Sequence, residues 1–549
     1  KEFLMKETKL HYDMSLVVNS NNGLKMYLTN LEKGKKATPR SYCYKNLDDS
    51  TVLDNWMAIL NTLESNGNEF EENVFQFDTS QLSKWGPQGG VAPIKDLLEE
   101  VVYPTFAQRE SPVAFSSNEW RIAKTLATRY LKRCGAVGLR PALYKSVIDD
   151  MRVRDTLESN SGFPDFTRRN KPEVIRRAAE DARSGRWKLY PAVALFRNYN
   201  QKTRLVWMFP MSANLVEGSF FQPLQSALMC SQARVAEFAP WKGFETVRTS
   251  ITASYAVNMS IAASDFSSTD AHFGLETSLE VYDVIQNCFQ EKYRSDLLES
   301  IIRMHTIPLV IGVDNMLVGE HGVSSGSNWT NFIESIFDLI FSYYVSLKEA
   351  SFKGINLNLT AAGAVGTDEV YSILYAIGDD MSWVVDRDNF DPDFQTRLEA
   401  YGREVGQVIK AEKTMNDPDK VKSLQRLFQR GYERPDREVR AVYSTIRALK
   451  SIIFPEKFHK PKLWSKDMEA IRDFMILENC VDHPLFERFC KFVADGDPYL
   501  RQFARKSTSF QDRQFRLSKH LPGLNTTYNQ ERRDSSISEF QSVKFLKEN

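Results

Sequence analysis

The segment 371–385 constrains the fold of this chain more than any other. It reads Tyr-Ser-Ile-Leu-Tyr-Ala-Ile-Gly-Asp-Asp-Met-Ser-Trp-Val-Val, so two β-prone apolar runs flank Gly378-Asp379-Asp380. This pattern predicts a β-hairpin with a pair of carboxylates at its tip. Adjacent aspartates repel each other between poorly solvating strands, and a bound divalent cation would relieve that repulsion. An exposed aspartate turn fits equally well, and this segment alone does not separate the two interpretations.

Two upstream segments carry further polar side chains next to expected secondary structure. Residues 257–263 are mostly apolar and predict a buried strand, with Asp265 at its C-terminal end and Asp270 a turn later. Residues 324–331 read Ser-Ser-Gly-Ser-Asn-Trp-Thr-Asn and precede a stretch with helical periodicity. Its N-cap is expected at Ser327 or Asn328. The apolar residues on one face of that helix are Phe332, Ile333, Ile336, Phe337, Ile340 and Tyr344.

These three elements, in this order and spacing, resemble motifs A, B and C in the palm of viral RNA-dependent RNA polymerases. The wording Asp-Phe-Ser-Ser-Thr-Asp and Ser-Gly-Ser-Asn-Trp-Thr-Asn is similar to that of the picobirnavirus polymerases of double-stranded RNA viruses, with partitivirus-like enzymes as neighbours. The resemblance is specific over about residues 155–435. It implies an RNA-directed RNA polymerase, a nucleotidyltransferase that replicates and transcribes a viral double-stranded RNA genome.

The fold class that the resemblance implies is α+β, a right-handed polymerase with fingers, a palm and a helical thumb. Its palm would be an antiparallel sheet flanked by helices. We expect a closed hand, because the N-terminal region and the helical C-terminal third both exceed a bare palm. The expected parts are an N-terminal extension linking fingers and thumb (1–75), fingers (76–220), palm (221–430, with about 295–322 contributing to the fingers), and thumb with C-terminal tail (431–549).

The chemistry of nucleotidyl transfer explains why such a site needs several carboxylates. Two divalent cations about 4 Å apart activate the attacking 3′-hydroxyl and steady the leaving pyrophosphate. Unpaired carboxylates at about 4 Å repel by roughly 4 kcal/mol at an effective dielectric constant of about 20, and a bound cation removes that cost. The resemblance implies Asp265 and Asp379 as the principal ligands of Mg²⁺ or Mn²⁺. Asp380 would be a supporting ligand, because neighbouring side chains on a strand point apart.

The resemblance also implies which residues bind the incoming nucleotide. Asp270 and Asn331 would contact the ribose 2′-hydroxyl, since a carboxylate accepts and an amide donates or accepts a hydrogen bond. Asp270 could alternatively, or additionally, act as the N-cap of the following helix. Ser325 and Gly326 would form a flexible loop against the nascent base pair, and glycine would permit close approach of the backbone. Thr330 belongs to the same motif.

A strongly basic stretch ends at Arg204, immediately before an apolar strand. This end resembles motif F, so Arg197, Lys202 and Arg204 would hold the triphosphate, whose oxygens both kinds of cation bind. The preceding basic residues 176–186 are more typical of a solvated helix face.

Three further segments resemble motifs of the same family. Residues 394–410 predict a helix, and Lys413 follows in a turn, as in motif D, whose lysine would protonate the leaving pyrophosphate. Lys410 is a rival for that role, and a surface lysine at a helix end is the alternative. Residues 424–432 resemble the primer-grip motif E, and residues 161–164 the template-guiding motif G.

The C-terminal part of the chain predicts a helical domain and a polar tail. Residues 436–505 read mostly as helices with aromatic anchors. The tail from Lys506 is expected to be partly irregular, although its aromatic residues would allow it to dock on the body. This extra material could provide a platform for initiation without a primer. At the other end, residues 1–4 precede Met5 and read as a cloning remnant.

Charge and cysteine content limit the other classes. Lys plus Arg and Asp plus Glu both number 71, so overall charge gives no indication of nucleic acid. The six cysteines show no Cys-x2-Cys pair, which fits a reducing compartment. Cys480, His483 and Cys490 could form a partial zinc site, but buried thiols fit better. No apolar run approaches the roughly 20 residues of a membrane span, and no signal peptide is visible.

The expected partners are therefore RNA template and product, ribonucleoside triphosphates and a viral capsid protein, with no membrane, in the virion interior and the host cytoplasm. A reverse transcriptase is the second interpretation, but Gly378 stands where that class usually has methionine or a similar residue. Asp270 and Asn331 also suit a site that accepts a 2′-hydroxyl. The third interpretation is a non-catalytic RNA-binding or capsid-associated protein with a degenerate palm. The presence of both Asp265 and Asp379 argues against it.

Overall fold

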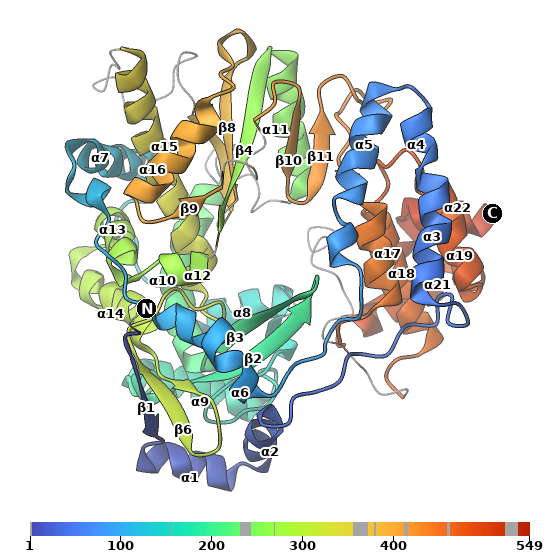
Figure 1. The fold of residues 1–549 in the computed structure, drawn as a ribbon. Coiled ribbons are helices and arrows are strands. Elements are labelled where there is room, and N and C mark those ends of the chain that lie inside the picture. Colours follow the sequence, from blue (N-terminus) through green and yellow to red (C-terminus); the bar gives the residue numbers. More distant parts are fainter. Residues whose placement is uncertain are drawn as a thin grey trace. The chain divides into compact units, whose positions relative to one another are not determined.

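The chain forms two compact units in the computed structural model (Figure 1). Unit 1 comprises Lys1–Lys33, Pro93–Leu195 and Leu205–Leu424, and unit 2 comprises Gly34–Ala92, Phe196–Arg204 and Gln425–Asn549. The structure describes residues 3–154, 156–230, 243–267, 269–354, 372–377, 380–410, 416–457, 462–521 and 536–549, and at 372–377, 380, 381 and 389 the backbone alone. The predicted boundaries of fingers, palm and thumb stay predictions.

A four-stranded sheet in unit 1 contains the predicted hairpin. Its strand order is β7-β8-β4-β9, and β4 pairs antiparallel with both β8 and β9. The strands are β4 (Met259–Ser267), β7 (Ser372–Ile377), β8 (Asp380–Asp386) and β9 (Val408–Ile409). The hairpin prediction is confirmed for both strands, and its tip, Gly378 and Asp379, lies outside the described residues.

A long apolar helix supports this sheet. It is α15 (Trp329–Lys353), which packs against β7 and against α7 (Asn118–Arg133). The predicted helix is therefore confirmed, but it is buried on nearly all sides rather than along one stripe, as expected of a helix that is apolar all round. Phe341 meets Trp383 of β8 edge-on with ring centroids 5.9 Å apart, and Trp383 Nε1 donates to Ser264 Oγ at 2.9 Å. This packing fixes the strand that carries Asp265.

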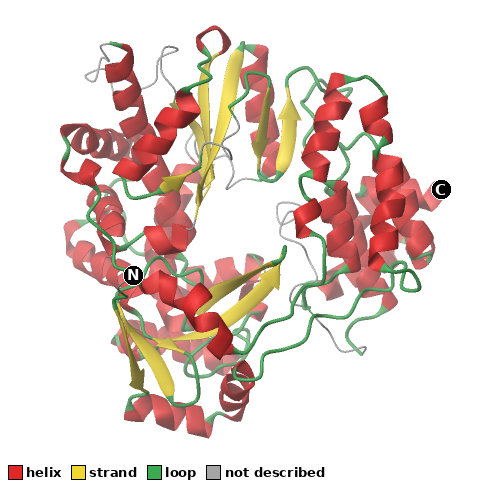
Figure 2. Ribbon diagram, viewed as in Figure 1, coloured by secondary structure: helices red, strands yellow, loops and turns green. Residues whose placement is uncertain are grey.

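A second sheet joins distant segments in the order β1-β6-β5-β2-β3. Its strands are among those drawn in yellow in Figure 2. Its strands are β1 (Met5–Lys9), β2 (Ala192–Tyr199), β3 (Lys202–Met208), β5 (Leu309–Val310) and β6 (Asn315–Gly319). The backbone N of Leu4 donates to the carbonyl of Phe106 at 2.6 Å, and Phe3 bridges to Ala107. Phe3 and Leu4, which the sequence suggested were part of a cloning remnant, therefore take part in the fold.

Helices make up most of the remainder of unit 1. The prediction of a helix over 394–410 is wrong beyond Glu404, because Gly406 adopts a φ of 80°, and the chain then enters β9. The other helices are α1 (Tyr12–Ser20), α2 (Asn22–Leu31), α6 (Ile94–Leu97), α8 (Tyr144–Val153), α9 (Pro172–Ser184), α10 (Met211–Cys230), α11 (Phe244–Ala256), α12 (Thr269–His272), α13 (Leu275–Ile285), α14 (Arg294–Thr306) and α16 (Phe394–Glu404). A short strand, β10 (Lys420–Ser423), follows them.

Unit 2 is largely helical, as predicted for the C-terminal part. Its helices are α3 (Asp49–Leu60), α4 (Thr62–Ser65), α5 (Glu69–Thr79), α17 (Thr445–Ile453), α18 (Lys466–Glu478), α19 (Phe486–Gly496), α20 (Tyr499–Ala504), α21 (Thr508–Ser518) and α22 (Gln541–Glu548). Strands β11 (Arg426–Gln429) and β12 (Val442–Tyr443) pair antiparallel.

The C-terminal tail docks within unit 2, as its aromatic content predicted. Its described residues form α21 and α22 rather than irregular chain. Glu478 of α18 accepts hydrogen bonds from the backbone N of Gln541 at 2.8 Å and from Ser542 Oγ at 3.0 Å, and Phe515 is buried. A buried carboxylate thus caps the first turn of the last helix.

Asp78 links the N-terminal part of unit 2 to its C-terminal helices. It lies at the end of α5, is fully buried, and accepts hydrogen bonds from Ser444 Oγ (2.7 Å) and from the backbone N of Ile446 (2.9 Å) at the start of α17. Thr445 also donates to it through its backbone N at 3.1 Å and through Oγ1 at 2.6 Å, and His483 Nε2 lies 2.9 Å from it. Burial alone would raise the pKa of Asp78, but the hydrogen bonds from His483 and Thr445 outweigh it and lower the pKa.

Asp78→Ala should destabilise the protein by about 3–5 kcal/mol at pH 7, because it leaves buried donors without an acceptor. Because the folded-state pKa is lowered, this stabilisation is present at neutral pH and is lost as the pH falls below the ordinary value of 3.8. Urea unfolding of the wild type and the variant at pH 7 measures the loss. Asp54→Ala, at an exposed position of α3, is the control and should stay within about 0.5 kcal/mol of the wild type. Equal effects of the two substitutions would contradict this account of Asp78.

Candidate active site

The register of the four-stranded sheet brings two of the predicted acidic residues together. Asp265 of β4 is the direct antiparallel partner of Asp380 of β8, and Cα atoms of such partners lie about 4.5–5.5 Å apart. Strand β4 runs to Ser267, so Asp265 lies within the strand rather than at its end. Ser264 and Phe266 are buried on one face of β4, so the two-residue period leaves Asp265 on the other, where it is exposed.

The donor chemistry of this site fits a hard divalent cation. Carboxylate oxygens are the ligands that Mg²⁺ and Mn²⁺ prefer. No group of three or more His, Cys, Asp or Glu side chains arranged to hold a metal occurs among the described residues. Asp379, which the sequence predicts as a further ligand, lies outside them.

Asp270 is carried by the four-residue helix α12, which backbone contacts hold in place. Arg109 Nε donates to the carbonyl of Ala271 at 2.7 Å, and Arg109 Nη2 donates to the carbonyl of Thr105 at 2.8 Å. Asp270 is exposed and lies in the first turn of α12 rather than before it, so the N-cap alternative does not fit the observed bounds. Arg109, which supports this helix from a distant segment of the chain, was not predicted from the sequence.

The loop before α15 is hydrogen-bonded to two neighbouring elements, α14 and β3, and to the first turn of α15 itself. Ser324 Oγ donates to the carbonyl of Met304 at 2.9 Å, and Ser325 Oγ donates to the carbonyl of Leu205 at 3.1 Å. Thr330 Oγ1 donates back to the carbonyl of Ser324 at 2.5 Å. The expected flexible loop is therefore bonded to α14 and β3 as well as to α15. At its tip Gly326 lies so close to β3 that an added Cβ would stand 1.4 Å from the carbonyl oxygen of Trp207.

The start of α15 agrees with the sequence prediction, which placed the N-cap at Ser327 or Asn328. Ser327 Oγ accepts from the backbone N of Trp329 at 3.1 Å, whereas the side chain of Asn328 makes no cap bond. Asn331 is exposed in the first turn of α15. A further anchor of the loop is a buried carboxylate, Glu217 of α10, which accepts from Ser327 Oγ and from the backbone N of Asn328. Sequence reasoning missed Glu217, whose only signal is an acidic residue inside an apolar helix.

The three predicted phosphate-binding cations differ in their surroundings. Arg197 donates through Nε and Nη2 to the two carboxylate oxygens of Glu456, both at 2.8 Å, within unit 2. Lys202 and Arg204 are exposed and make no ion pair among the described residues. The charge of Arg197 is thus balanced by Glu456, whereas Lys202 and Arg204 have no carboxylate partner among the described residues.

A buried lysine, Lys450, holds the turn between β2 and β3 in place. Asn200 and Gln201 have φ angles of 54° and 61°, typical of a two-residue hairpin turn. Lys450 Nζ donates to Asn200 Oδ1 and, at 3.2 Å, to Gln88 Oε1. Burial lowers the pKa of Lys450 to about 7. Lys450, Gln88 and Glu456 were not predicted from the sequence, because only the fold brings them to this turn.

The structure says less about the predicted lysine of motif D and about the possible zinc ligands. Lys413 lies outside the described residues, and Lys410 is exposed immediately after β9. Cys480 and Cys490 are buried free thiols. His483 uses Nε2 to bind Asp78 and Nδ1 to accept from the backbone N of Leu485, so both ring nitrogens are engaged. This arrangement argues against the zinc interpretation.

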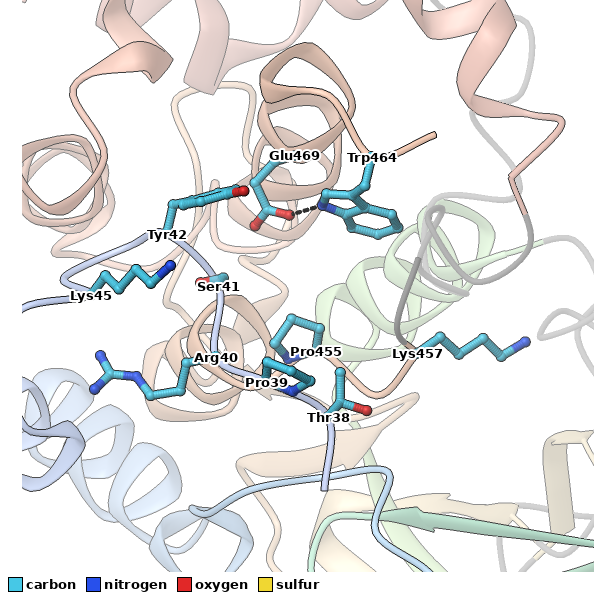
Figure 3. A pocket seen from close by; sticks show the side chains of 10 residues that line it. All are labelled: Thr38, Pro39, Arg40, Ser41, Tyr42, Lys45, Pro455, Lys457, Trp464 and Glu469. Atoms are coloured by element: carbon cyan, nitrogen blue, oxygen red, sulfur yellow. Dashed lines mark hydrogen bonds between the residues drawn. The ribbon is translucent and has the colours of Figure 1, made fainter. Parts of the chain in front are cut away.

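A pocket of about 200 Å³ lies within unit 2, between residues 38–45 and the segment that leads into α18 (Figure 3). Arg40 donates to the carbonyls of Tyr44 and Leu47, and Trp464 Nε1 donates to Glu469 Oε2 at 2.5 Å. These polar groups stabilise the wall of the pocket itself. None of the predicted site residues lines it.

Residues 199–456 match the family model described as viral RNA-dependent RNA polymerase. The predicted resemblance to this family is confirmed. The matched range begins at the turn between β2 and β3 and ends just after α17, so it contains most of the predicted motifs. The predicted enzyme class, an RNA-directed RNA polymerase, is confirmed with it.

Relatives and solved structures agree with the family match. The chain is 24% identical over 505 residues to a "Potential RNA-dependent RNA polymerase" of human picobirnavirus, covering 87% of this chain and 85% of that protein. It is 22% identical over 219 residues to the RNA-directed RNA polymerase of Cryptosporidium parvum virus 1, covering 39% and 38%. The crystal structure of the polymerase of a human picobirnavirus matches with a TM-score of 0.78 at 20% identity, over 98% of this chain and 100% of that one.

An insertion-loop deletion mutant of a human picobirnavirus polymerase also matches, with a TM-score of 0.73 at 20% identity, over 98% of this chain and 100% of that one. The predicted α+β polymerase fold is therefore confirmed. None of the described helices combines the length and apolar character that a membrane span requires.

Proposed function

We propose that this polymerase copies and transcribes a double-stranded RNA genome by two-metal nucleotidyl transfer, and that it initiates without a primer. The observation that supports the chemistry most strongly is the register that pairs Asp265 with Asp380 across β4 and β8. Two carboxylate-bearing residues on adjacent strands are what a cation-dependent transfer of phosphoryl groups requires.

Different residues of the chain would hold the metal cations and the triphosphate. Asp265, Asp379 and Asp380 would hold Mg²⁺ or Mn²⁺, and the bound cations would supply positive charge at the attacking and leaving oxygens. Arg204 and Lys202 would bind the triphosphate, while Arg197 keeps the β2–β3 hairpin bonded to Glu456.

Three further positions complete the proposed nucleotide site. Asp270 and Asn331, both exposed at the start of helices, would contact the ribose 2′-hydroxyl. Lys413 Nζ, or that of Lys410, would give its proton to the leaving pyrophosphate. Ser325, Gly326 and Thr330 would place the loop against the new base pair.

Synthesis on a short single-stranded RNA template tests this function. We expect incorporation of ribonucleotides, dependent on template and on Mg²⁺ or Mn²⁺, with deoxyribonucleotides used far less well. Preferential use of deoxyribonucleotides would instead support the reverse transcriptase alternative. Failure to incorporate any nucleotide under all metal conditions would support a non-catalytic RNA-binding protein.

The tail, the partners and the location belong to the same proposal. The docked helices α21 and α22 would support a platform for unprimed initiation. Removing the tail from Lys506 should then reduce initiation on unprimed template more than extension of a primed one. A viral capsid protein is the proposed partner, and the virion interior and host cytoplasm are the proposed sites of action.

Arg204→Ala should raise the KM for ribonucleoside triphosphates about 10- to 100-fold, because a charge-assisted hydrogen bond contributes about 1.5–3 kcal/mol. Steady-state kinetics on a homopolymeric template measure the change. Arg176→Ala is a matched control, since Arg176 is exposed on α9 among the basic residues predicted as a solvated face. An unchanged KM in Arg204→Ala, or an equal rise in both variants, would contradict the assignment.

A further inference from the structure

A carboxylate buried in α10 holds the loop that carries Ser325 and Gly326. Glu217 is 2% exposed and accepts hydrogen bonds from Ser327 Oγ, from the backbone N of Asn328 at 3.0 Å and from Asn214 Nδ2 at 2.9 Å. Two of these three donors belong to the loop. The carboxylate therefore fixes both a side chain and the backbone at the point where the loop enters α15.

A second layer of hydrogen bonds holds this arrangement from the other side. Asn214 Nδ2 also donates to the carbonyl of Gly326 at 3.3 Å, and Asn328 Nδ2 donates to the carbonyl of Asn214 at 3.2 Å. Arg169 Nη2 donates to Asn214 Oδ1 at 2.8 Å. Every one of these groups lies in unit 1, and none of them belongs to the predicted metal site. Helix α10 thus holds the loop through two side chains three residues apart, the carboxylate of Glu217 and the amide of Asn214.

Burying an ionisable carboxylate this completely costs folding free energy, which a purely structural anchor would not require. Burial raises the pKa of Glu217 to about 7, although the bonds from Ser327, Asn214 and Asn328 lower it. The charged side chain that faces it is Arg169, whose positive charge also favours the ionised form. Above pH 7 the carboxylate is ionised and only accepts hydrogen bonds, and below pH 7 it gains a proton that weakens its hold on the loop donors.

We propose that Glu217 is a positioning residue for nucleotide binding, and that its ionised form holds the Ser325–Asn331 segment in place for the incoming nucleotide. This inference rests on the proposed role of that segment. The acid acts through the loop and touches neither the nucleotide nor the metal ligands. Because the ionised form is the one that grips, binding of nucleotide should weaken as the pH falls through about 7.

Glu217→Gln tests the proposal, because glutamine keeps the shape and one acceptor but carries no charge and adds a donor. At pH 8 we expect amide hydrogen exchange in residues 324–329 to be about tenfold faster than in the wild type. The KM for ribonucleotides should rise about tenfold with kcat little changed. Between pH 6 and 8 the KM of the wild type should fall, whereas the KM of the variant should stay nearly level.

Two further variants separate positioning from folding. Glu280→Gln makes the same change at a carboxylate of α13 that accepts from Trp120 Nε1 at 2.8 Å, and should leave exchange at 324–329 and the pH profile unaltered. Glu217→Asp keeps the charge and should retain the pH dependence. Thermal melting of Glu217→Gln at pH 8 checks that the variant is folded under the conditions of the exchange measurement.

Hydrogen exchange is measured without substrate, so it reports on the loop whether or not the chain makes RNA. Unaltered exchange at residues 324–329 in Glu217→Gln would overturn the anchoring role. Faster exchange with an unaltered KM and pH profile would overturn the positioning role. Failure of the proposed function itself would appear separately, as absence of synthesis by the wild type.

Discussion

Asp265→Asn should reduce RNA synthesis by at least about 10³-fold while the fold remains intact. The substitution removes the negative charge of a carboxylate on β4 directly opposite Asp380, and an amide is a poor ligand for a hard divalent cation. Loss of one group that stabilises transition-state charge commonly costs about 10²–10³ in kcat, and loss of a metal ligand should cost at least as much. Because Asp265 is exposed, the free energy of unfolding should change by about 0.5 kcal/mol or less.

The matched control is Asp388→Asn, an exposed carboxylate just beyond the other end of β8. It makes the same chemical change near the same sheet and should leave the rate of synthesis within about twofold of the wild type. Single-turnover extension of a primed template measures both variants. Comparable rates in Asp265→Asn and Asp388→Asn would remove Asp265 from the site.

Gly326→Ala should have the second largest effect, a loss of about 10²-fold or more in kcat/KM. An added Cβ would stand 1.4 Å from the carbonyl oxygen of Trp207 and 2.6 Å from its carbonyl carbon, so the loop or β3 must move. The obstacle is backbone, which cannot rotate away as a flexible side chain can. Displacement of a positioned group by about 1 Å can cost about 10²-fold in rate.

Gly312→Ala provides the control for this substitution. Gly312 lies between β5 and β6 in the same unit, and an added Cβ there meets nothing within 4 Å. Kinetics and thermal melting of both variants separate local displacement from unfolding. If Gly326→Ala retained wild-type kinetics, the close approach of the loop to β3 would have no functional importance.

The sequence predicted those parts of the fold that follow from local periodicity. The hairpin at 371–385 and the helix after residue 331 were foreseen, because apolar residues recur there with the periods of a strand and a helix. The end of the helix at Glu404 was missed, because the periodic pattern continues past Gly406, whose positive φ stops the helix.

Contacts between distant segments account for what the sequence did not predict. Arg197 was foreseen as a phosphate ligand, but its partner Glu456 is 259 residues away and emerges only from the fold. Gly326 was expected to permit close approach of the backbone to the nascent base pair, but its close contact with the backbone of β3 emerges only from the fold. Glu217 carries no recognisable local pattern, because an acid within an apolar helix has meaning only once its donors are known.

Binding of Mn²⁺, measured by electron paramagnetic resonance on the full chain, tests the central claim most directly. We expect the wild type and Asp388→Asn to bind Mn²⁺ equally. Asp265→Asn should bind it at least about tenfold more weakly, since even a group that only orients a metal ligand contributes about 10- to 100-fold to affinity. Equal Mn²⁺ affinity in the wild type and Asp265→Asn would show that the carboxylate on β4 holds no cation, and would contradict the proposed mechanism.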